Sequence, residues 1–248
     1  MSYLDIDTSK RHILSLSGGK DSTALAVHLK NKIPNLEYVF CDTGEELRET
    51  YAYLDKIEQV LKIKLVRLGG GKRFDDHLKD QKGFLPAPFA RWCTRVMKIK
   101  PYENYVGNDS AISYMGIRAD ECDRGGYISK RGNITPCYPF REDNIKLQDV
   151  YKMLISSGLG IPEYYKWRTR SGCYFCFYQR TIEWVGLYEN HPDLFARAQA
   201  HEKTGFTWIK GKSLQWIIDN KEAIKRRAAK RAEKEEVDQL KPCDICHL

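Results

Sequence analysis

The chain has 248 residues, of which 42% are hydrophobic and 30% charged, so it can bury one sizeable core and a smaller appendage. No run reaches the roughly 18 apolar residues of a membrane helix, and Met1-Ser2-Tyr3-Leu4-Asp5 is not the start of a secretory signal. We therefore expect a cytoplasmic protein without membrane contact. The formal net charge of +8, from 41 Lys and Arg against 33 Asp and Glu, favours an anionic partner, although a nucleotide pocket would explain part of the excess.

The first part of the chain alternates strand-like and helix-like stretches. Short apolar runs at 13–16, 38–41, 65–68 and 111–116 suit buried parallel strands, and helical spacing lies between them at 22–32 and 46–62. This alternation predicts an α/β fold with a doubly wound parallel sheet, in which ligands bind at the carboxyl ends of the strands. We assign residues 1–140 to this domain. Residues 69–92, rich in Gly, Lys and Pro, predict a loop, either a mobile flap over the site or a plain surface loop.

From residue 141 the pattern becomes helical. Apolar spacing predicts helices over 143–157, around 184–188 and over 192–203, the last of which starts at His191-Pro192. A long charged helix is expected over 213–239. Because no internal repeat or low-complexity tract occurs, we expect residues 141–248 to form a helical region that packs on the first domain.

A glycine-rich turn joins the first strand to the first helix, with the sequence Ser17-Gly18-Gly19-Lys20-Asp21-Ser22-Thr23. Adjacent glycines allow the backbone to approach an anion, and the N–H groups at a helix start point towards negative charge. Lys20 adds a cation, and Ser17, Ser22 and Thr23 add hydroxyls. The spacing is not that of the common mononucleotide P-loop. The turn is nevertheless predicted to hold phosphates.

This turn resembles the SGGxDS pyrophosphatase loop of the PP-loop superfamily. Three later segments are similar to the PAPS reductase branch of that superfamily: Asp42-Thr43-Gly44 with Glu49-Thr50, Arg91 to Pro101, and Gly116-Ile117-Arg118 continuing to Arg124. The resemblance implies that residues 17–23 grip the phosphates of ATP or an adenylyl sulfate with Mg²⁺. It also implies that Asp42, Thr43 and Gly44 lie near the ribose or adenine, and that Gly116, Arg118 and Arg124 hold phosphate or the second substrate. The catalytic candidates are Lys20, Asp21, Asp42 and Cys93.

The spacing of the cysteines predicts a second site. Cys173 and Cys176 form one C-x-x-C pair and Cys243 and Cys246 another, and each pair can place two thiolates on one ion. Resemblance to reductases with a [4Fe-4S] cluster implies that Cys93 joins Cys173 and Cys176. Thr94 stands where those reductases have a further cysteine, so a fourth ligand would be Cys246, or else Cys243. A structural Zn²⁺ held by both pairs and a redox dithiol or merely packed thiols are the alternatives. Cys41 ends an apolar strand and is predicted to be a core residue.

The resemblance leaves three functions open. In the first, ATP adenylates an oxygen on a nucleic acid, either DNA or tRNA, and sulfur supplied by a donor such as a cysteine desulfurase displaces AMP. In the second, the protein is a sulfonucleotide reductase that releases sulfite, although the tail matches the Glu-Cys-Gly-x-His motif of those enzymes only in part. In the third, it is a non-catalytic nucleotide-binding accessory protein. The oligomeric state cannot be deduced.

Two basic segments bear on nucleic-acid binding. Residues 164–170 mix three aromatic and three cationic side chains, which could stack on bases and contact phosphates, or could fill a junction between the two halves. The cations between Lys221 and Lys234 could form a track for phosphates, but they alternate with glutamates, a pattern more typical of a solvated helix face.

Overall fold

The computed structural model describes residues 2–69, 71–121, 125–126, 128–203 and 205–240, with side chains placed as far as residue 233. The chain divides into two compact units. Residues 1–82 and 89–173 form the first unit, and residues 83–88 and 174–248 form the second. The expected domain boundary at residue 140 therefore lies inside the first unit.

A five-stranded parallel sheet forms the centre of the first unit, with the strand order β3-β2-β1-β4-β5. The strands are β1 (Arg11–Ser15), β2 (Glu37–Cys41), β3 (Leu65–Leu68), β4 (Ala111–Tyr114) and β5 (Ile134–Cys137). Leu14 of β1 is in register with Tyr38 of β2 on one side and with Tyr114 of β4 on the other. The sheet confirms the predicted doubly wound α/β fold. The edge strand β5 was not predicted.

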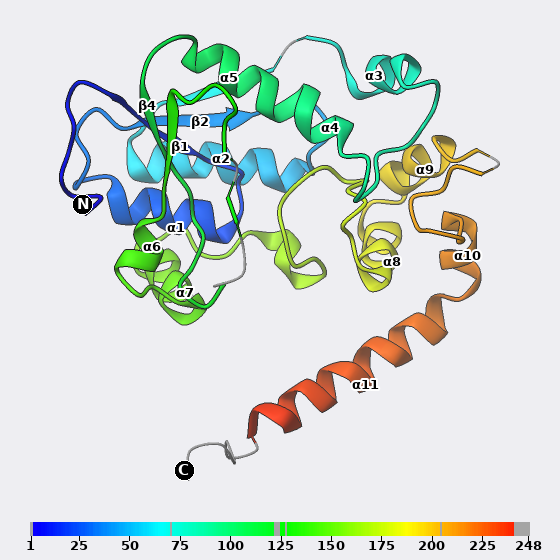
Figure 1. The fold of residues 1–248 in the computed structure, drawn as a ribbon. Helices are drawn as coiled ribbons and strands as arrows, with labels where there is room; N and C mark the ends of the chain where they lie inside the picture. The colour runs from blue at the N-terminus through cyan, green and yellow to red at the C-terminus, as the bar shows by residue number, and fades with distance from the viewer. Residues whose placement is uncertain (1, 70, 122–124, 127, 204, 241–248) are drawn as a thin grey trace, which may run out of the picture. The chain divides into compact units, whose positions relative to one another are not determined.

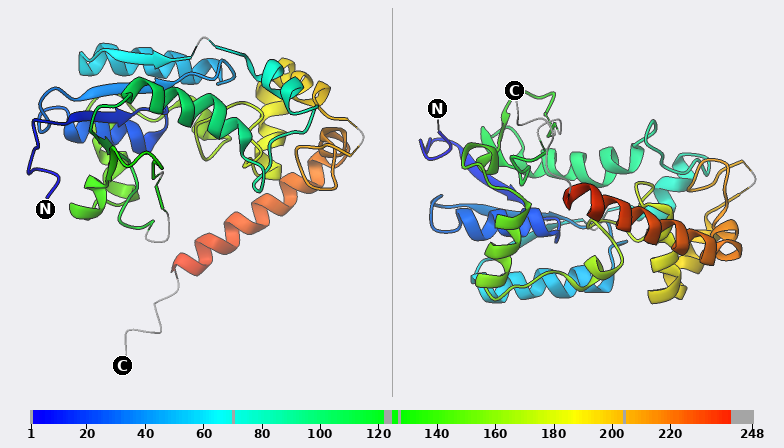
Figure 2. Two further views of the ribbon diagram at one scale, coloured as in Figure 1. Left: turned by 45° about the horizontal axis from the view of Figure 1, so that its top comes forward. Right: turned by 90° about the horizontal axis from the view of Figure 1, so that it is seen from below.

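Helices cover both faces of this sheet (Figures 1 and 2). On one face α1 (Lys20–Leu29), α2 (Arg48–Leu61) and α7 (Leu147–Ser156) share a core with Leu14 and Phe40 of the strands. On the other face α5 (Lys100–Val106) packs Tyr102 and Val106 against the strands. The first unit also contains α3 (Phe74–Asp80), α4 (Trp92–Thr94), the π-helix η1 (Arg95–Ile99), α6 (Pro139–Glu142) and the 3-10 helix η2 (Glu163–Lys166).

The segment 69–92 is not wholly a loop. It contains α3, whose first residue Phe74 is fully buried and stacks on Trp92 at a ring-centroid distance of 5.4 Å. This helix was missed because its apolar residues, Phe74 and Leu78, are only two and stand among charged residues. The burial of one aromatic ring against another thus stabilises this segment, and its composition does not predict the contact.

The second unit is helical, with α8 (Thr181–Asn190), α9 (Pro192–Ala200), α10 (Leu214–Asp219) and α11 (Lys221–Leu240). The start of α9 at Pro192 is as predicted, whereas the single helix expected over 213–239 is two helices separated at Asn220. Phe175 stacks on Trp208 at 5.0 Å, and buried Trp184 lies beside both Trp208 and Phe195. These rings supply a core for the unit.

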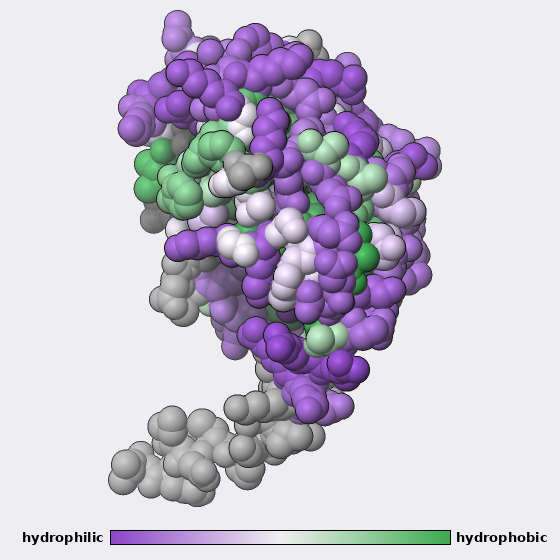
Figure 3. Space-filling model, turned by 90° about the vertical axis from the view of Figure 1, so that its right-hand side faces the viewer, coloured by the Kyte–Doolittle hydropathy of each residue, from purple (hydrophilic) through white to green (hydrophobic). Residues whose placement is uncertain are grey.

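None of the helices in the described part of the chain is both long enough and apolar enough to cross a membrane. The face drawn in Figure 3 is covered mainly by hydrophilic side chains, with hydrophobic residues in small groups.

Candidate nucleotide-binding site

A cavity of about 750 Å³ opens at the carboxyl ends of β1, β2 and β4, and all of its lining residues belong to the first unit. The strand order reverses between β1 and β4, so this is the crevice in which a doubly wound sheet binds ligands. The glycine-rich turn contributes Ser17, Gly19, Lys20, Asp21 and Ser22 to the lining. Gly116 and Arg118, which follow β4, also line it. The structure therefore brings these two predicted segments together around one cavity.

The turn adopts the close-packed shape expected of a phosphate loop. Gly18 has a φ of +70°, and a Cβ added to it would lie 2.8 Å from Cγ2 of Thr50, so only glycine fits. The hydroxyl of Ser17 lies 3.1 Å from that of Ser22, and both are on the cavity wall. Thr23 differs, because it is fully buried and its hydroxyl donates to the Gly19 carbonyl at 2.8 Å. We assign Thr23 to holding the turn in shape.

One carboxylate joins two cations beside the turn. Lys20 Nζ lies 2.9 Å from Asp21 Oδ2, and Arg118 Nη1 lies 2.8 Å from Asp21 Oδ1. Burial acts to lower the pKa of Arg118, but its hydrogen bonds to Asp21 and Asp120 outweigh burial and raise that pKa above its ordinary value. The guanidinium therefore stays charged at any physiological pH. A phosphate that entered here would meet two fixed positive groups and the N–H groups at the start of α1.

The end of β4 lies directly against the turn. A Cβ on Gly116 would lie 2.9 Å from both the carbonyl carbon and oxygen of Asp21. The close approach explains why glycine is needed before Arg118, whose side chain then reaches back to Asp21. Arg124, predicted to act with it, falls outside the described residues.

The end of β2 is acidic and internally hydrogen bonded. Tyr51 donates to Asp42 Oδ1 at 2.7 Å, and the Thr43 hydroxyl donates to the Glu46 carboxylate at 2.8 Å. Burial and the neighbouring Asp42 raise the pKa of Tyr51, so its phenol remains a donor. Glu46, rather than Asp42, is among the cavity-lining residues. Glu46 was not predicted as a site residue, although it stands directly after Asp42-Thr43-Gly44-Glu45.

A second segment, residues 164–172, packs on the turn, and we call it the strap. Tyr164 is fully buried and donates to the Gly18 carbonyl at 2.7 Å, while the Lys20 backbone N–H donates to the Tyr165 hydroxyl at 3.2 Å. Ser171 donates to Ser17 Oγ at 3.1 Å. The strap therefore fixes the turn through three contacts.

The side chains of the strap divide into buried and exposed ones. Besides Tyr164, Arg168 is 1% exposed and donates to the carbonyls of Gly172 and Cys173. These two side chains are structural. Thr169 and Arg170, by contrast, are exposed and line the cavity.

The cysteines are distributed over both units. Cys93 lies in α4, and Cys173 Sγ lies 3.3 Å from Thr43 Oγ1 and 3.9 Å from Glu46 Oε1. Cys176 belongs to the second unit, and Cys243 and Cys246 fall outside the described residues. Within the described residues there is no group of three or more His, Cys, Asp or Glu side chains that could hold a metal ion. Cys41, expected in the core, is half-buried and lines the cavity, and burial raises the pKa of its thiol to about 11.

Comparisons with known proteins show which proteins this chain resembles. The phosphoadenosine phosphosulfate reductase domain matches residues 11–177. The uncharacterized proteins MJ0973 and MJ0066 of Methanocaldococcus jannaschii are 28% and 27% identical over 206 and 225 residues, which are 78% and 82% of this chain but 48% and 45% of theirs. The chain thus spans about half the length of these relatives.

A solved structure shows the same fold. The phosphate complex of phosphoadenylyl-sulfate reductase from Candida auris superposes with a TM-score of 0.51 at 12% identity, covering 70% of this chain and 85% of that one. The domain match, which covers more than half of the sequence, identifies the chain as a member of the PAPS reductase family.

Proposed function

We propose that the protein binds ATP in the cavity, adenylates an oxygen of a second substrate, and supports transfer of sulfur to that position in a nucleic acid. The observation that carries the proposal is the contact of Lys20 and Asp21, on the turn, with Arg118, which follows β4, at the cavity wall. Two cations bridged by one carboxylate can rearrange around an incoming polyphosphate without leaving a buried charge unpaired. Asp21 would then be available to a Mg²⁺ ion that screens the phosphates.

The proposed chemistry has two displacements and no net redox change. The substrate oxygen attacks the α-phosphorus of ATP, the bond from that phosphorus to the α,β-bridging oxygen breaks, and pyrophosphate leaves with the bonding electrons. A hydrosulfide equivalent then attacks the adenylated centre, and the original oxygen leaves as part of AMP. Negative charge develops on the pyrophosphate as it leaves. The backbone N–H groups of the turn and Lys20 would stabilise this charge.

The acidic end of β2 favours ATP over a 3′-phosphorylated nucleotide. Glu46 lines the cavity, and its carboxylate can accept hydrogen bonds from ribose hydroxyls, whereas a 3′-phosphate would add like charge beside Glu46 and Asp42. Sulfonucleotide reduction is therefore the second candidate. A non-catalytic accessory role is the third, and it would keep nucleotide binding without either product.

The thiols are proposed to support the sulfur step. Cys93, Cys173 and Cys176, with Cys246 or else Cys243, would hold a [4Fe-4S] cluster, and thiolate ligands suit such a cluster or Zn²⁺. The described residues do not by themselves form a metal site, so none of the steps above is routed through the metal. Iron, zinc and acid-labile sulfide analysis of protein purified without oxygen distinguishes the two ions.

The test measures AMP and pyrophosphate formed from ATP with and without single-stranded DNA or tRNA, and sulfite formed from adenylyl sulfates. Lys20→Ala should reduce AMP formation by at least a hundredfold, a loss of about 2.7 kcal/mol of transition-state stabilisation. Lys64→Ala, which removes an exposed lysine just before β3, is the control and should leave it unchanged. Sulfite release without an ATP requirement would replace the proposal by reduction. Nucleotide binding with neither product would replace it by the accessory role.

A further inference from the structure

A row of cations lies on the helical segment 91–100, whose residues Lys98 and Ile99 line the cavity. Among residues 91–100 the exposed side chains are Arg91, Arg95 and Lys100, and all three are cationic. We call these three residues the cationic ridge. The same ten residues contain no Asp or Glu. This segment therefore presents positive charge alone to solvent.

A π-helix aligns the ridge. Arg91 and Arg95 are four residues apart, the spacing that places side chains on one face of an α-helix. Residues 95–99 are π-helical, and the Lys100 N–H donates to the Arg95 carbonyl, five residues earlier. Because one turn there spans an extra residue, Lys100 follows Arg95 along the same side. Local π-helical turns frequently mark functional sites.

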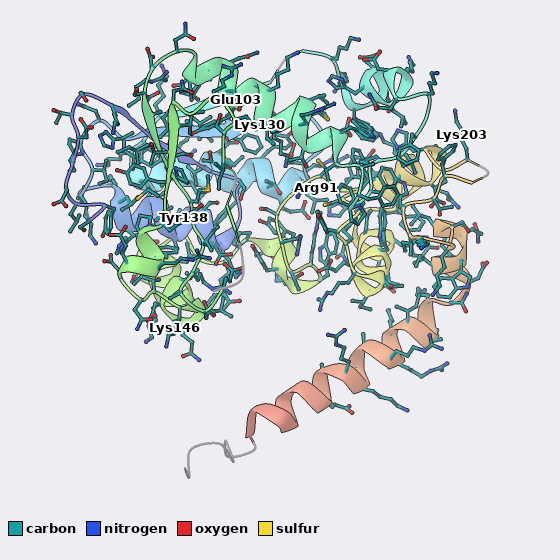
Figure 4. The ribbon with its side chains drawn as sticks, viewed as in Figure 1. Arg91, Glu103, Lys130, Tyr138, Lys146 and Lys203 are labelled. Atoms are coloured by element: carbon teal, nitrogen blue, oxygen red, sulfur yellow. The ribbon has the colours of Figure 1, made fainter. Side chains whose placement is uncertain are left out.

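Two of the three ridge cations have no acidic partner among the described residues. Arg95 and Lys100 form no ion pair with any other residue in the described part of the chain. The first acid after the ridge is Glu103, and it is engaged by Ser129, which donates to Oε1 at 2.8 Å, and by Arg131 at 3.7 Å. Those contacts bring a second basic loop to α5, where exposed Lys130 is labelled with Glu103 (Figure 4).

The inner side of the same segment reaches the cavity. Lys98 and Ile99 of η1 line it, together with Tyr102 of α5. An extended polyanion that followed the ridge would therefore lie on the solvent side of a segment that forms part of the wall of the proposed adenylation site. This arrangement suits a polymer of which one unit enters the cavity while flanking phosphates stay outside.

An exposed aromatic ring precedes the ridge. Phe89 is 85% exposed, the largest exposed fraction among the large hydrophobic side chains that the structure describes. It lies two residues before Arg91, which is labelled in Figure 4. An exposed aromatic beside a line of cations is the combination that binds single strands, because the ring stacks on an unpaired base and the cations contact the backbone.

We propose that Phe89 and the cationic ridge form the binding surface for a single-stranded segment of nucleic acid. The inference rests on the proposed function, to which it adds the surface and the strandedness of the acceptor. The charged helix α11 is the competing surface. Its Lys221 and Lys225 already lie beside Glu189 at 3.9 Å and 2.5 Å, which reduces the charge available to a phosphate.

The experiment measures fluorescence anisotropy of labelled single-stranded DNA, single-stranded RNA and a duplex at several salt concentrations. Loss of two phosphate contacts in Arg95→Gln/Lys100→Gln should reduce the slope of log K against log salt by about 1.4 for a single strand. The same change in slope predicts that this variant binds a single strand about 25-fold more weakly than the native protein at 0.1 M salt. Phe89→Ala should weaken single-strand binding about fivefold or more without changing the slope, because stacking releases no counterions.

Two matched variants control for charge and for exposed apolar area. Arg226→Gln/Arg227→Gln removes two exposed cations from α11, and Ile155→Ala shortens a side chain that is 66% exposed on α7. Both should bind single strands as the native protein does. Equal loss in the α11 variant, an unchanged slope in the ridge variant, or tighter binding of the duplex would overturn the proposal.

A separate readout distinguishes this surface from the proposed function. ATP affinity, measured by calorimetry without nucleic acid, should be unchanged in the ridge variant. If single strands bind through the ridge but AMP never forms, the proposed chemistry fails and the surface stands. If AMP forms but single strands do not depend on the ridge, the surface fails and the chemistry stands.

Discussion

Substitution of Gly116 by alanine tests whether the close approach of β4 to the turn builds the nucleotide site. The added Cβ would lie 2.9 Å from two backbone atoms of Asp21 and 3.2 Å from the Ser22 nitrogen. Backbone atoms at a helix start cannot rotate away as a side chain can, so the turn must shift. Overpacking of this kind costs about 1–3 kcal/mol of unfolding free energy. The shift would also move Asp21 away from Arg118, so we expect ATP affinity to fall at least tenfold, about 1.4 kcal/mol.

Gly125→Ala is the matched control for this prediction. Gly125 also lines the cavity, but its added Cβ would have no heavy atom within 4 Å. Urea unfolding gives the change in stability, and calorimetric titration with ATP gives the change in affinity. Gly125→Ala should match the native protein in both. If the two alanine variants unfold at the same urea concentration and bind ATP equally, the contact between Gly116 and Asp21 does not shape the site.

Three further predictions concern single side chains. Tyr164→Phe leaves the buried Gly18 carbonyl without its hydrogen-bond donor and should lower the unfolding free energy by about 1–3 kcal/mol. An unchanged urea midpoint would contradict this prediction. With a pKa of about 11, the Cys41 thiol should be about a thousandth ionised at pH 8, so peptide mass spectrometry should find it alkylated by iodoacetamide far more slowly in the folded than in the unfolded protein. Burial lowers the pKa of His28 despite its hydrogen bond to Asp143, so the unfolded chain binds the proton more tightly. The unfolding free energy should therefore rise with pH up to and through the pKa of about 6.5 of the histidine in the unfolded chain. Urea titrations between pH 5 and 7 should show a smaller rise in His28→Gln.

The elements that carry the sheet could be predicted because buried parallel strands are continuous apolar runs. The predicted runs at 13–16, 38–41 and 65–68 overlap β1, β2 and β3, and the polar segments that follow them lie at one edge of the sheet. The fifth strand could not be found this way. Ile134-Thr135-Pro136-Cys137 contains a proline, and only its first residue is buried. A strand at the edge tolerates both features because one side of its backbone pairs with no neighbour.

The phosphate loop could be placed from sequence because its function depends on consecutive residues. Gly18, Gly19 and Lys20 need only their own spacing and the start of a helix to bring N–H groups and a cation to one point. The partners of these residues could not be predicted in the same way. Arg118 reaches Asp21 from 97 residues away, and Tyr164 reaches Gly18 from 146 residues away. Such contacts depend on how the strands and connections are ordered, which local pattern does not encode.

The strap shows why composition misleads about aromatic and basic segments. Tyr164, Tyr165 and Arg168 have the chemistry of a nucleic-acid surface, yet their polar atoms are engaged by backbone groups of the turn and of residues 172–173. A buried guanidinium must satisfy its donors within the protein, and carbonyl oxygens do so at less cost than a mobile ligand would. The ridge differs because its cations are exposed and Arg95 and Lys100 have no acidic partner within the described residues. Exposure and missing neutralisation, rather than the number of basic residues, therefore decide which segment can bind a polyanion.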